Sequence, residues 1–359
     1  MKIFIIFPKD SEALFNKNSK RTFGGASVQM YNIAKELSNY NNIDVYSIIP
    51  EYKQINFDDK DKFRLIKIYN ETDNILLKFI KFLKKIFLLR PHAIIQHGLT
   101  TESCILAFFC WMLKIKFVFM FAHDVEVRGL RQSDNSKVKL FKLLLKCSYA
   151  LITQNKYQEQ TLLRNYKKNS LILYNGFEIK EKLNLKNKNK FILWVARCDS
   201  WKKPDLFIKL AKRNKAIQFV MICPKSSDQK YYDRIQKEAK KIKNLEFIEF
   251  VPYYEIEEYF KKALLFVNTS LHEGFPQTFI QAWMFSTPII SLHVNPDEII
   301  TKYECGIFCS GDFELMNRGL HRLYSDKVLY KQMAKNAFEY AWKFHNVKNN
   351  VKELLSILE

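Results

Sequence analysis

One stretch of the sequence combines a carboxylate, a glycine turn and the start of an expected helix. Glu273 and Gly274 follow an apolar segment, residues 263–267, that predicts a buried parallel strand. Residues 279–284 predict a helix, and Pro276 suits its first turn because that turn leaves backbone N–H groups unpaired. Such a helix end favours an anion, and a carboxylate accepts hydrogen bonds from hydroxyl groups. The stretch therefore suits a sugar attached to a pyrophosphate, with an ordinary strand-to-helix crossover as the alternative.

Two cationic residues follow an earlier expected strand, in the same strand-loop-helix arrangement. Residues 191–196 predict that strand, Arg197 follows it, and Lys202 precedes a helix expected at 206–213. An arginine and a lysine five residues apart could clamp a pyrophosphate through charge-assisted hydrogen bonds. Two solvated cations in a loop are the alternative.

The first half of the chain offers a glycine pair before a helix. Gly24 and Gly25 follow a polar loop and precede an amphipathic helix expected at 27–39. Glycine lets the backbone approach a ligand closely because it has no Cβ. A plain turn would use the same residues.

Polar residues also follow a strand expected at 117–121. His123 and Asp124 come first, and Glu126 and Arg128 lie further along the same loop. Open parallel sheets bind ligands beyond the carboxyl ends of their strands. His123 is thus a site candidate, with a hydrogen-bonded loop histidine as the alternative, and the other three are acceptor-side or structural candidates.

Strands and helices alternate along the chain, which predicts an α/β fold with parallel sheets. A chain of 359 residues is too long for one typical core, so two domains are expected. Little apolar content between Glu178 and Lys190 predicts a linker there. The expected organisation is a first domain over 1–177, a linker over 178–190, a second domain over 191–340 and a C-terminal helix over 341–359.

The stretch from Leu271 to Trp283 resembles the donor-site motif of retaining glycosyltransferases of the GT-B fold, specifically glycosyltransferase family 4. Members typically carry a Glu, seven residues and a second Glu, whereas this chain has Glu273 and then Gln281. The family also carries a pair like Arg197 and Lys202. The resemblance implies two Rossmann-like domains facing across a cleft, with the C-terminal helix returning to the first domain.

Four residues at three places in the sequence depart from the family pattern. The second acid of the motif usually holds the ribose hydroxyls, and Gln281 offers hydrogen bonds there without charge. Cys223-Pro224 and Phe250 stand where members usually have glycine. These departures predict altered nucleotide affinity and altered loops near the base.

The resemblance implies a role for each candidate. Arg197 and Lys202 would neutralise the diphosphate leaving group, Glu273 would contact the sugar hydroxyls, and His123 would support the sugar from the other domain. The full implied set is, for catalysis, Glu273, His123, Lys202 and Arg197; for the donor, Gly24, Gly25, Arg197, Lys202, Glu273, Gly274, Phe275, Pro276, Thr278 and Gln281; and on the acceptor side, Asp124, Glu126 and Arg128.

The implied activity is transfer of a sugar from a UDP- or GDP-type donor to a glycan or lipid-linked acceptor, as in surface polysaccharide or lipopolysaccharide synthesis. No cofactor and no metal are expected, because the two cations would balance the diphosphate. Asp59-Lys60-Asp61 matches the Asp-x-Asp of metal-dependent transferases but lies far from the other motifs. A degenerate transferase scaffold that binds glycans or nucleic acid is the alternative.

The net charge of +21 favours an anionic partner. Residues 75–90 predict a basic amphipathic helix that would suit an anionic membrane surface, or else a solvated face of an ordinary helix. No nucleic-acid-binding motif is found, and no nucleic-acid partner is expected. Seven scattered cysteines without a pairing pattern and no signal peptide predict a cytoplasmic protein that could lie peripherally on the membrane.

Overall fold

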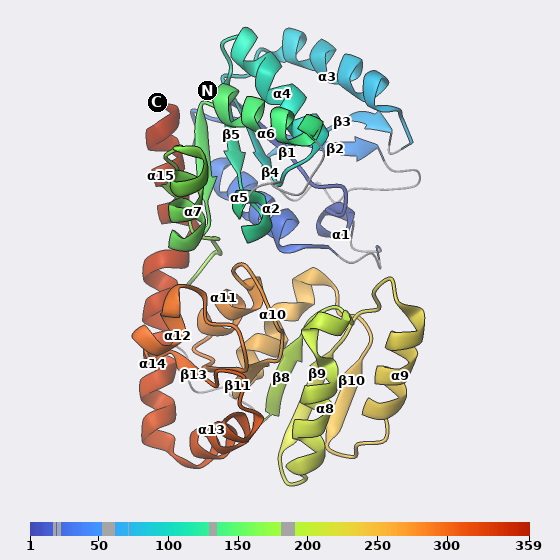
Figure 1. The fold of residues 1–359 in the computed structure, drawn as a ribbon, viewed down its shortest axis with the longest axis vertical. Helices are drawn as coiled ribbons and strands as arrows, with labels where there is room; N and C mark the ends of the chain where they lie inside the picture. Colours follow the sequence, from blue (N-terminus) through green and yellow to red (C-terminus); the bar gives the residue numbers. More distant parts are fainter. Residues whose placement is uncertain (17–18, 20–22, 52–61, 71, 129–134, 181–190) are drawn as a thin grey trace. The chain divides into compact units, whose positions relative to one another are not determined.

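The computed structural model describes residues 1–359 except 17–18, 20–22, 52–61, 71, 129–134 and 181–190. The chain divides into two compact units (Figure 1). Unit 1 comprises Met1–Glu178 together with Val347–Glu359, and unit 2 comprises Ile179–Asn346. The chain therefore leaves unit 1 once and returns to it at its C-terminal end. The predicted linker 178–190 falls largely on residues 181–190, which lie outside the described residues.

Unit 1 contains a seven-stranded sheet in the order β3-β2-β1-β4-β5-β6-β7. Every neighbouring pair of its strands is parallel. Parallel neighbours need crossover connections, and helices supply them here except between β2 and β3, where residues 52–61 lie outside the described part of the chain. The strands are β1 (Lys2–Ile6), β2 (Asp44–Glu51), β3 (Arg64–Asn70), β4 (Ala93–His97), β5 (Lys116–Met120), β6 (Ala150–Thr153) and β7 (Leu171–Ile172). The helices are α1 (Glu12–Phe15), α2 (Gly25–Leu37), α3 (Ile75–Leu89), α4 (Thr101–Met112), α5 (Asp124–Arg128), α6 (Asn135–Cys147), α7 (Lys156–Tyr166) and α15 (Val347–Leu358).

Both faces of this sheet are covered by apolar side chains, because alternate residues of a strand point to opposite faces. Ile3 of β1 belongs to a core cluster with Met30 of α2 and Leu354 of α15. Phe4 belongs to a second cluster with Ala107 of α4. The C-terminal helix α15 is thus an integral part of the unit 1 core.

Unit 2 contains a six-stranded parallel sheet in the order β10-β9-β8-β11-β12-β13. Trp194 of β8 packs with Phe207 of α8 on one face, and Phe266 of β11 meets Phe260 of α10 and Phe279 of α11 on the other. The strands are β8 (Phe191–Val195), β9 (Gln218–Ile222), β10 (Leu245–Ile248), β11 (Leu265–Asn268), β12 (Ile289–Ser291) and β13 (Gly306–Phe308). The helices are η1 (Ser200–Lys202), α8 (Pro204–Arg213), α9 (Gln229–Ala239), α10 (Tyr253–Lys262), α11 (Gln277–Trp283), η2 (Pro296–Glu298), α12 (Ile299–Lys302), α13 (Phe313–Ser325) and α14 (Lys327–His345).

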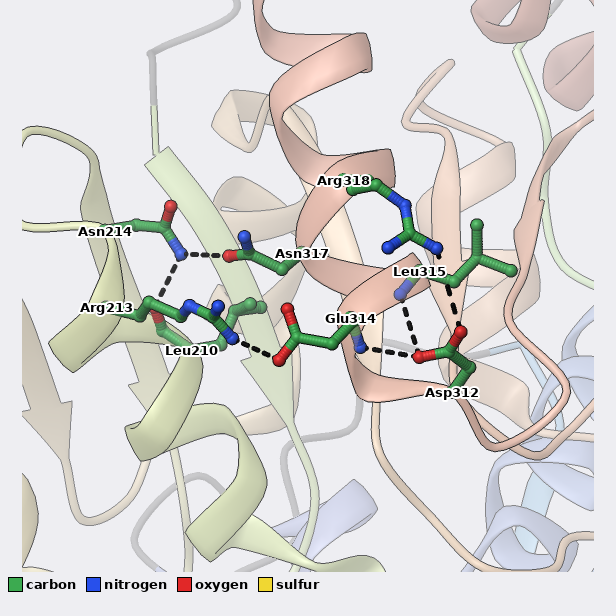
Figure 2. Close-up of polar contacts among 8 residues, drawn as sticks. All are labelled: Leu210, Arg213, Asn214, Asp312, Glu314, Leu315, Asn317 and Arg318. Carbon is green, nitrogen blue, oxygen red and sulfur yellow. Dashed lines mark hydrogen bonds and ion pairs between the residues drawn. The ribbon is translucent and has the colours of Figure 1, made fainter.

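Polar contacts tie α8 to α13 in unit 2, as Figure 2 shows. Asn214 is buried, and its side-chain N–H donates to Asn317 Oδ1 at 2.9 Å. Arg213 pairs with Glu314 on the surface, where such pairs contribute little to stability. Asp312 caps α13 by accepting the backbone N–H of Glu314 at 2.7 Å. The hydrogen bond from the buried Asn214 to Asn317 is therefore the main polar link between the two helices.

Two details differ from the sequence-based expectation. Residues 341–345 are the end of α14 in unit 2, and the return to unit 1 begins only at Val347. The helical pattern runs on without a strong break, so the sequence does not mark this crossing. The strand β3 also had no counterpart in the expected elements, because its burial is mixed and leaves no clear alternation.

Candidate active site

Lys202 and Glu273 form an ion pair at the carboxyl ends of two neighbouring strands of unit 2. Lys202 ends the short helix η1 after β8, and Glu273 lies in the loop after β11. Their side chains are only 15% and 13% exposed. Burial lowers the pKa of the Lys202 ammonium, and the Glu273 carboxylate partly opposes this effect. The two catalytic candidates, which lie far apart in the sequence, are thus in direct contact.

An aromatic pair covers Lys202. Its Nζ lies 3.9 Å from the centre of the Trp201 ring, within the range of a cation–π interaction. Trp201 stacks on His272 with ring centres 5.0 Å apart and a 16° angle between the planes. The backbone N–H of Leu271 donates to the carbonyl of Trp201 at 2.9 Å, which joins the two loops. Sequence reasoning missed Trp201 and His272, although each directly precedes a predicted site residue.

A chain of hydrogen bonds holds the Lys202 backbone in place. Trp194 Nε1 donates to Thr269 Oγ1 at 2.9 Å, and Thr269 Oγ1 donates to the Lys202 carbonyl at 2.7 Å. Trp194 and Thr269 are both buried. Lys203 then takes a left-handed conformation (φ 51°), and Pro204 begins α8. The position of Lys202 is therefore fixed by core residues of β8 and by the loop after β11.

Arg197 lies close to this pair. Its Nε is 3.5 Å from Asp199 Oδ2, and its side chain is 48% exposed, so the guanidinium remains accessible. Its positive charge contributes to the lowered pKa of Lys202. The structure thus brings Arg197, Lys202 and Glu273 together and adds Asp199, which the sequence analysis did not single out.

The glycine turn after Glu273 leads into the seven-residue helix α11. Pro276 is the cap before this helix and not part of its first turn, which corrects the sequence-based expectation. Phe275 is buried and its ring lies 4.9 Å from that of His345, at the end of α14. Gly274 and Thr278 are half-buried beside it. Phe275 therefore anchors the turn to the core of unit 2.

Gln281 is also buried, in α11 one turn beyond Gln277. It is 7% exposed, so an acid at this position would need a partner for its charge. The neutral amide removes that requirement. This is a physical reason for the departure from the Glu-x7-Glu pattern.

In unit 1, the carboxylate of Glu126 accepts hydrogen bonds from the protein backbone. Its two carboxylate oxygens accept the backbone N–H groups of Leu99 at 3.0 Å and Ala122 at 2.8 Å. Burial raises the pKa of Glu126, and these two hydrogen bonds oppose the rise. Glu126 thus fixes the loops after β4 and β5, and each of its oxygens already accepts a backbone hydrogen bond.

His123 is exposed and lies near a second histidine that sequence reasoning did not single out. His97, at the end of β4, is 6% exposed, and its Nε2 lies 3.3 Å from Gln154 Nε2. Burial, followed by the effect of His123, lowers the pKa of His97 to about 3. Gln154 also donates to the carbonyl of Phe121 at 2.7 Å. Neutral polar groups therefore lie beneath the predicted sugar-facing histidine.

Asp124 and Arg128 both turn toward α7. Gln158 Nε2 donates to Asp124 Oδ1 at 3.0 Å. Arg128 Nε donates to the hydroxyl of Tyr157 at 2.8 Å. These two acceptor-side candidates thus hold α5 against α7, although Asp124 keeps a second oxygen.

Gly24 begins α2 next to an acid that the sequence analysis did not single out. The backbone N–H of Gly24 donates to Asp10 Oδ2 at 2.6 Å, and the Ser27 hydroxyl donates to Asp10 Oδ1. Asp10 therefore neutralises the positive end of this helix. A phosphate at Gly24 and Gly25 has to compete with that carboxylate.

Asp59-Lys60-Asp61 lies outside the described residues. Elsewhere in the described chain, no three His, Cys, Asp or Glu side chains gather as a metal site would require. No helix within the described ranges is long and apolar enough to cross a membrane.

The sequence of unit 2 matches a known family. Residues 176–340 match the family model described as Glycosyl transferases group 1. This match falls almost entirely within unit 2. An uncharacterized glycosyltransferase of Haemophilus influenzae is 26% identical over 157 residues, which cover 42% of this chain and 43% of that protein. The match thus spans less than half the length of the relative.

Solved structures show the same fold over the whole chain. The structure of Anabaena HepE in complex with UDP has a TM-score of 0.77 at 13% identity and covers 99% of both chains. A mutant of S. aureus TarM, in complex with Fondaparinux, alpha-GlcNAc-glycerol and UDP, has a TM-score of 0.74 at 12% identity and covers 100% of this chain and 99% of that one. The two-unit fold is therefore that of GT-B glycosyltransferases.

Proposed function

We propose that this protein is a glycosyltransferase that uses a nucleotide-sugar donor. The observation that carries the proposal is the contact between Lys202 and Glu273, with Arg197 beside them, at the carboxyl ends of β8 and β11. Ligands of open α/β sheets bind at these strand ends. The group 1 domain covers this site, which supports the same conclusion.

The three side chains divide the chemistry of the transfer between them. As the bond from the sugar to the diphosphate breaks, negative charge grows on the diphosphate, and the cations of Arg197 and Lys202 stabilise it. Glu273 accepts hydrogen bonds from sugar hydroxyls and keeps the Lys202 ammonium in place. Because the pair is mostly shielded from water, its electrostatic effect is stronger than on an open surface.

We further propose that the enzyme is a retaining member of glycosyltransferase family 4 and needs no metal. Two positioned cations already balance much of the charge of a diphosphate. The donor would be of the UDP or GDP type, and UDP is the nucleotide bound by the two similar proteins described above. Gln281 in place of the usual acid leaves the ribose contact to an uncharged amide.

For the acceptor, we propose a glycan or a lipid-linked sugar, as in the synthesis of lipopolysaccharide or another surface polysaccharide. His123 and the remaining Asp124 oxygen are the unit 1 groups that would contact it or the transferred sugar. Such a reaction places the enzyme in the cytoplasm, close to the membrane that carries the acceptor. A glycan-binding protein without transferase activity is the alternative, and Gln281 is the observation that favours it.

Turnover of the donor tests this proposal. The protein is incubated with UDP- and GDP-sugars in EDTA, with and without glycan acceptors, and the released nucleoside diphosphate is measured. We expect release from one donor class, reduced about 100-fold or more in Glu273→Gln. Glu238→Gln, an exposed change on α9, is the control and should retain the wild-type rate. Full activity in Glu273→Gln, or no turnover of any donor by the wild-type protein, would contradict the proposal.

A further inference from the structure

Helix α3 exposes an unusual amount of apolar surface. Only Phe82 and Ile86 of this helix are buried, and they fill the core of unit 1. Leu76, Phe87 and Leu88 are 67%, 62% and 70% exposed. Figure 1 shows α3 on the outside of unit 1, beside α4. Isolated exposed hydrophobic residues are common, but a contiguous group of them marks an interaction surface.

The exposed side chains of α3 share one side of the helix. Leu76, Ile80 and Phe87 are spaced four and seven residues apart and form one stripe. Leu77 and Leu88, eleven residues apart, form a second stripe next to it. We call these five residues, together with Lys84, which lies between the stripes, the α3 face. Helix α3 is thus apolar on the side that packs against unit 1 and apolar again on the side turned away.

The end of α4, a neighbour of α3, also exposes apolar side chains. The rings of Phe79 in α3 and Phe109 in α4 lie 4.6 Å apart, so the two helices are neighbours. Trp111 and Met112, at the end of α4, are 59% and 56% exposed. Tryptophan is enriched at the boundary between a bilayer and water, because its ring is apolar and its N–H is polar.

Lysines accompany the apolar side chains. Lys84 lies on the α3 face, and Lys85 follows it toward a basic edge that also holds Lys81 and Lys78. Lys81 is paired with Asp73 at 2.7 Å. Within the described ranges, Lys84 and Lys85 have no acidic partner. Their long stems can cover apolar surface while the ammonium groups reach outward.

We propose that the α3 face docks on the surface of an anionic lipid bilayer. An apolar stripe bordered by lysines is the arrangement of helices that lie in a membrane interface, with apolar side chains in the acyl region and cations at the headgroups. A symmetric contact with a second copy would bring the unpaired Lys84 side chains of two highly basic chains together, which disfavours that occupant. This proposal does not depend on the proposed transferase function, because binding of the α3 face to vesicles can be measured without sugar transfer.

Vesicle flotation tests the α3 face. The protein is mixed with phosphatidylcholine vesicles that contain one-quarter phosphatidylglycerol, or none, at low and at high salt. We expect binding to the anionic vesicles that weakens with salt. The double variants Ile80→Ser/Phe87→Ser and Lys84→Glu/Lys85→Glu should each bind at least about 10-fold more weakly.

Matched changes elsewhere serve as controls. Val328→Ser removes an 81% exposed side chain of α14, and Lys230→Glu/Lys241→Glu reverses two exposed charges of unit 2. Both should bind vesicles like the wild type, and circular dichroism and Tm should show that all variants fold. The proposal would be overturned if the α3 variants bound anionic vesicles as well as these controls do, or if the wild type did not bind them.

If a second copy of the chain binds the α3 face instead, sedimentation velocity would show a dimer, and Ile80→Ser/Phe87→Ser would dissociate it. This result would also overturn the proposal. Failure of the membrane proposal can be distinguished from failure of the proposed transferase function. The α3 variants should keep the thermal shift produced by the donor nucleotide, whereas loss of donor turnover in Glu273→Gln should leave vesicle binding unchanged.

Discussion

The two sheets present different groups at the carboxyl ends of their strands. In unit 2, Lys202 and Glu273 lie together and partly exposed, with Arg197 accessible beside them. In unit 1, Glu126 is fully used by backbone N–H groups, and His97 is buried and neutral. The same fold thus carries an ion pair in one unit and, in the other, a carboxylate and a neutral imidazole that are held by hydrogen bonds within the protein. Charge marks the place where a diphosphate would be held, and neutral polar groups suit sugar hydroxyls.

The largest expected difference between the two sites is in the free energy of unfolding that each loses when its carboxylate is replaced. Glu126→Ala would leave the part-buried N–H groups of Leu99 and Ala122 without this partner, at a cost of about 2–4 kcal/mol in the free energy of unfolding. Glu273→Gln should cost less, about 1–2 kcal/mol, because the amide oxygen can still accept a hydrogen bond from the partly exposed Lys202 ammonium. Urea unfolding of both variants and of the exposed control Glu238→Ala measures the contrast. Equal stability of Glu126→Ala and the control would show that Glu126 is not the structural anchor of these loops.

A smaller expected effect is the pH dependence of stability that His97 of unit 1 causes. The pKa of His97 is about 3 in the folded protein and about 6.5 in an unfolded chain. Between these values the unfolded chain binds a proton that the folded chain does not, so stability falls as the pH decreases through this window. One such group contributes at most about 1.4 kcal/mol per pH unit.

The variant His97→Asn isolates this contribution. Other groups titrate in the same range, so the measured quantity is the difference between wild type and variant in the loss of unfolding free energy from pH 6 to pH 5. We expect the wild type to lose about 1 kcal/mol more than the variant. Parallel pH profiles for the two proteins would show that His97 is not held neutral by burial.

Much of the fold could be predicted, because buried parallel strands leave short apolar runs that sequence periodicity reveals. Residues 191–196 and 117–121 are such runs, and they correspond to the buried strands β8 and β5. The crossing at Asn346 could not be predicted, since α14 and α15 are both amphipathic and only their partners differ. Strand β3 was missed because its partly exposed residues mix polar and apolar types without a regular period.

The roles assigned to the site residues were predicted from short motifs, and such motifs report which residue types are present rather than what each side chain contacts. Arg197, Lys202 and Glu273 are close together as the pyrophosphate hypothesis requires. Glu126 looked equally available in the sequence, but its oxygens are bound to backbone groups that no local pattern identifies. Asp10 was missed for the same reason, because its contact with Gly24 spans a loop.

The central claim is that the unit 2 cations hold the diphosphate of a nucleotide sugar. A thermal-shift panel with UDP, GDP, ADP and CMP in EDTA first selects the nucleotide, since a ligand of the folded state raises Tm. Calorimetry then compares the Kd of that nucleoside diphosphate with the Kd of its nucleoside, for the wild type, Lys202→Met and the exposed control Lys212→Met. We expect Lys202→Met to weaken diphosphate binding about 10- to 100-fold and to leave nucleoside binding unchanged. Equal diphosphate affinity in the wild type and Lys202→Met would contradict the central claim.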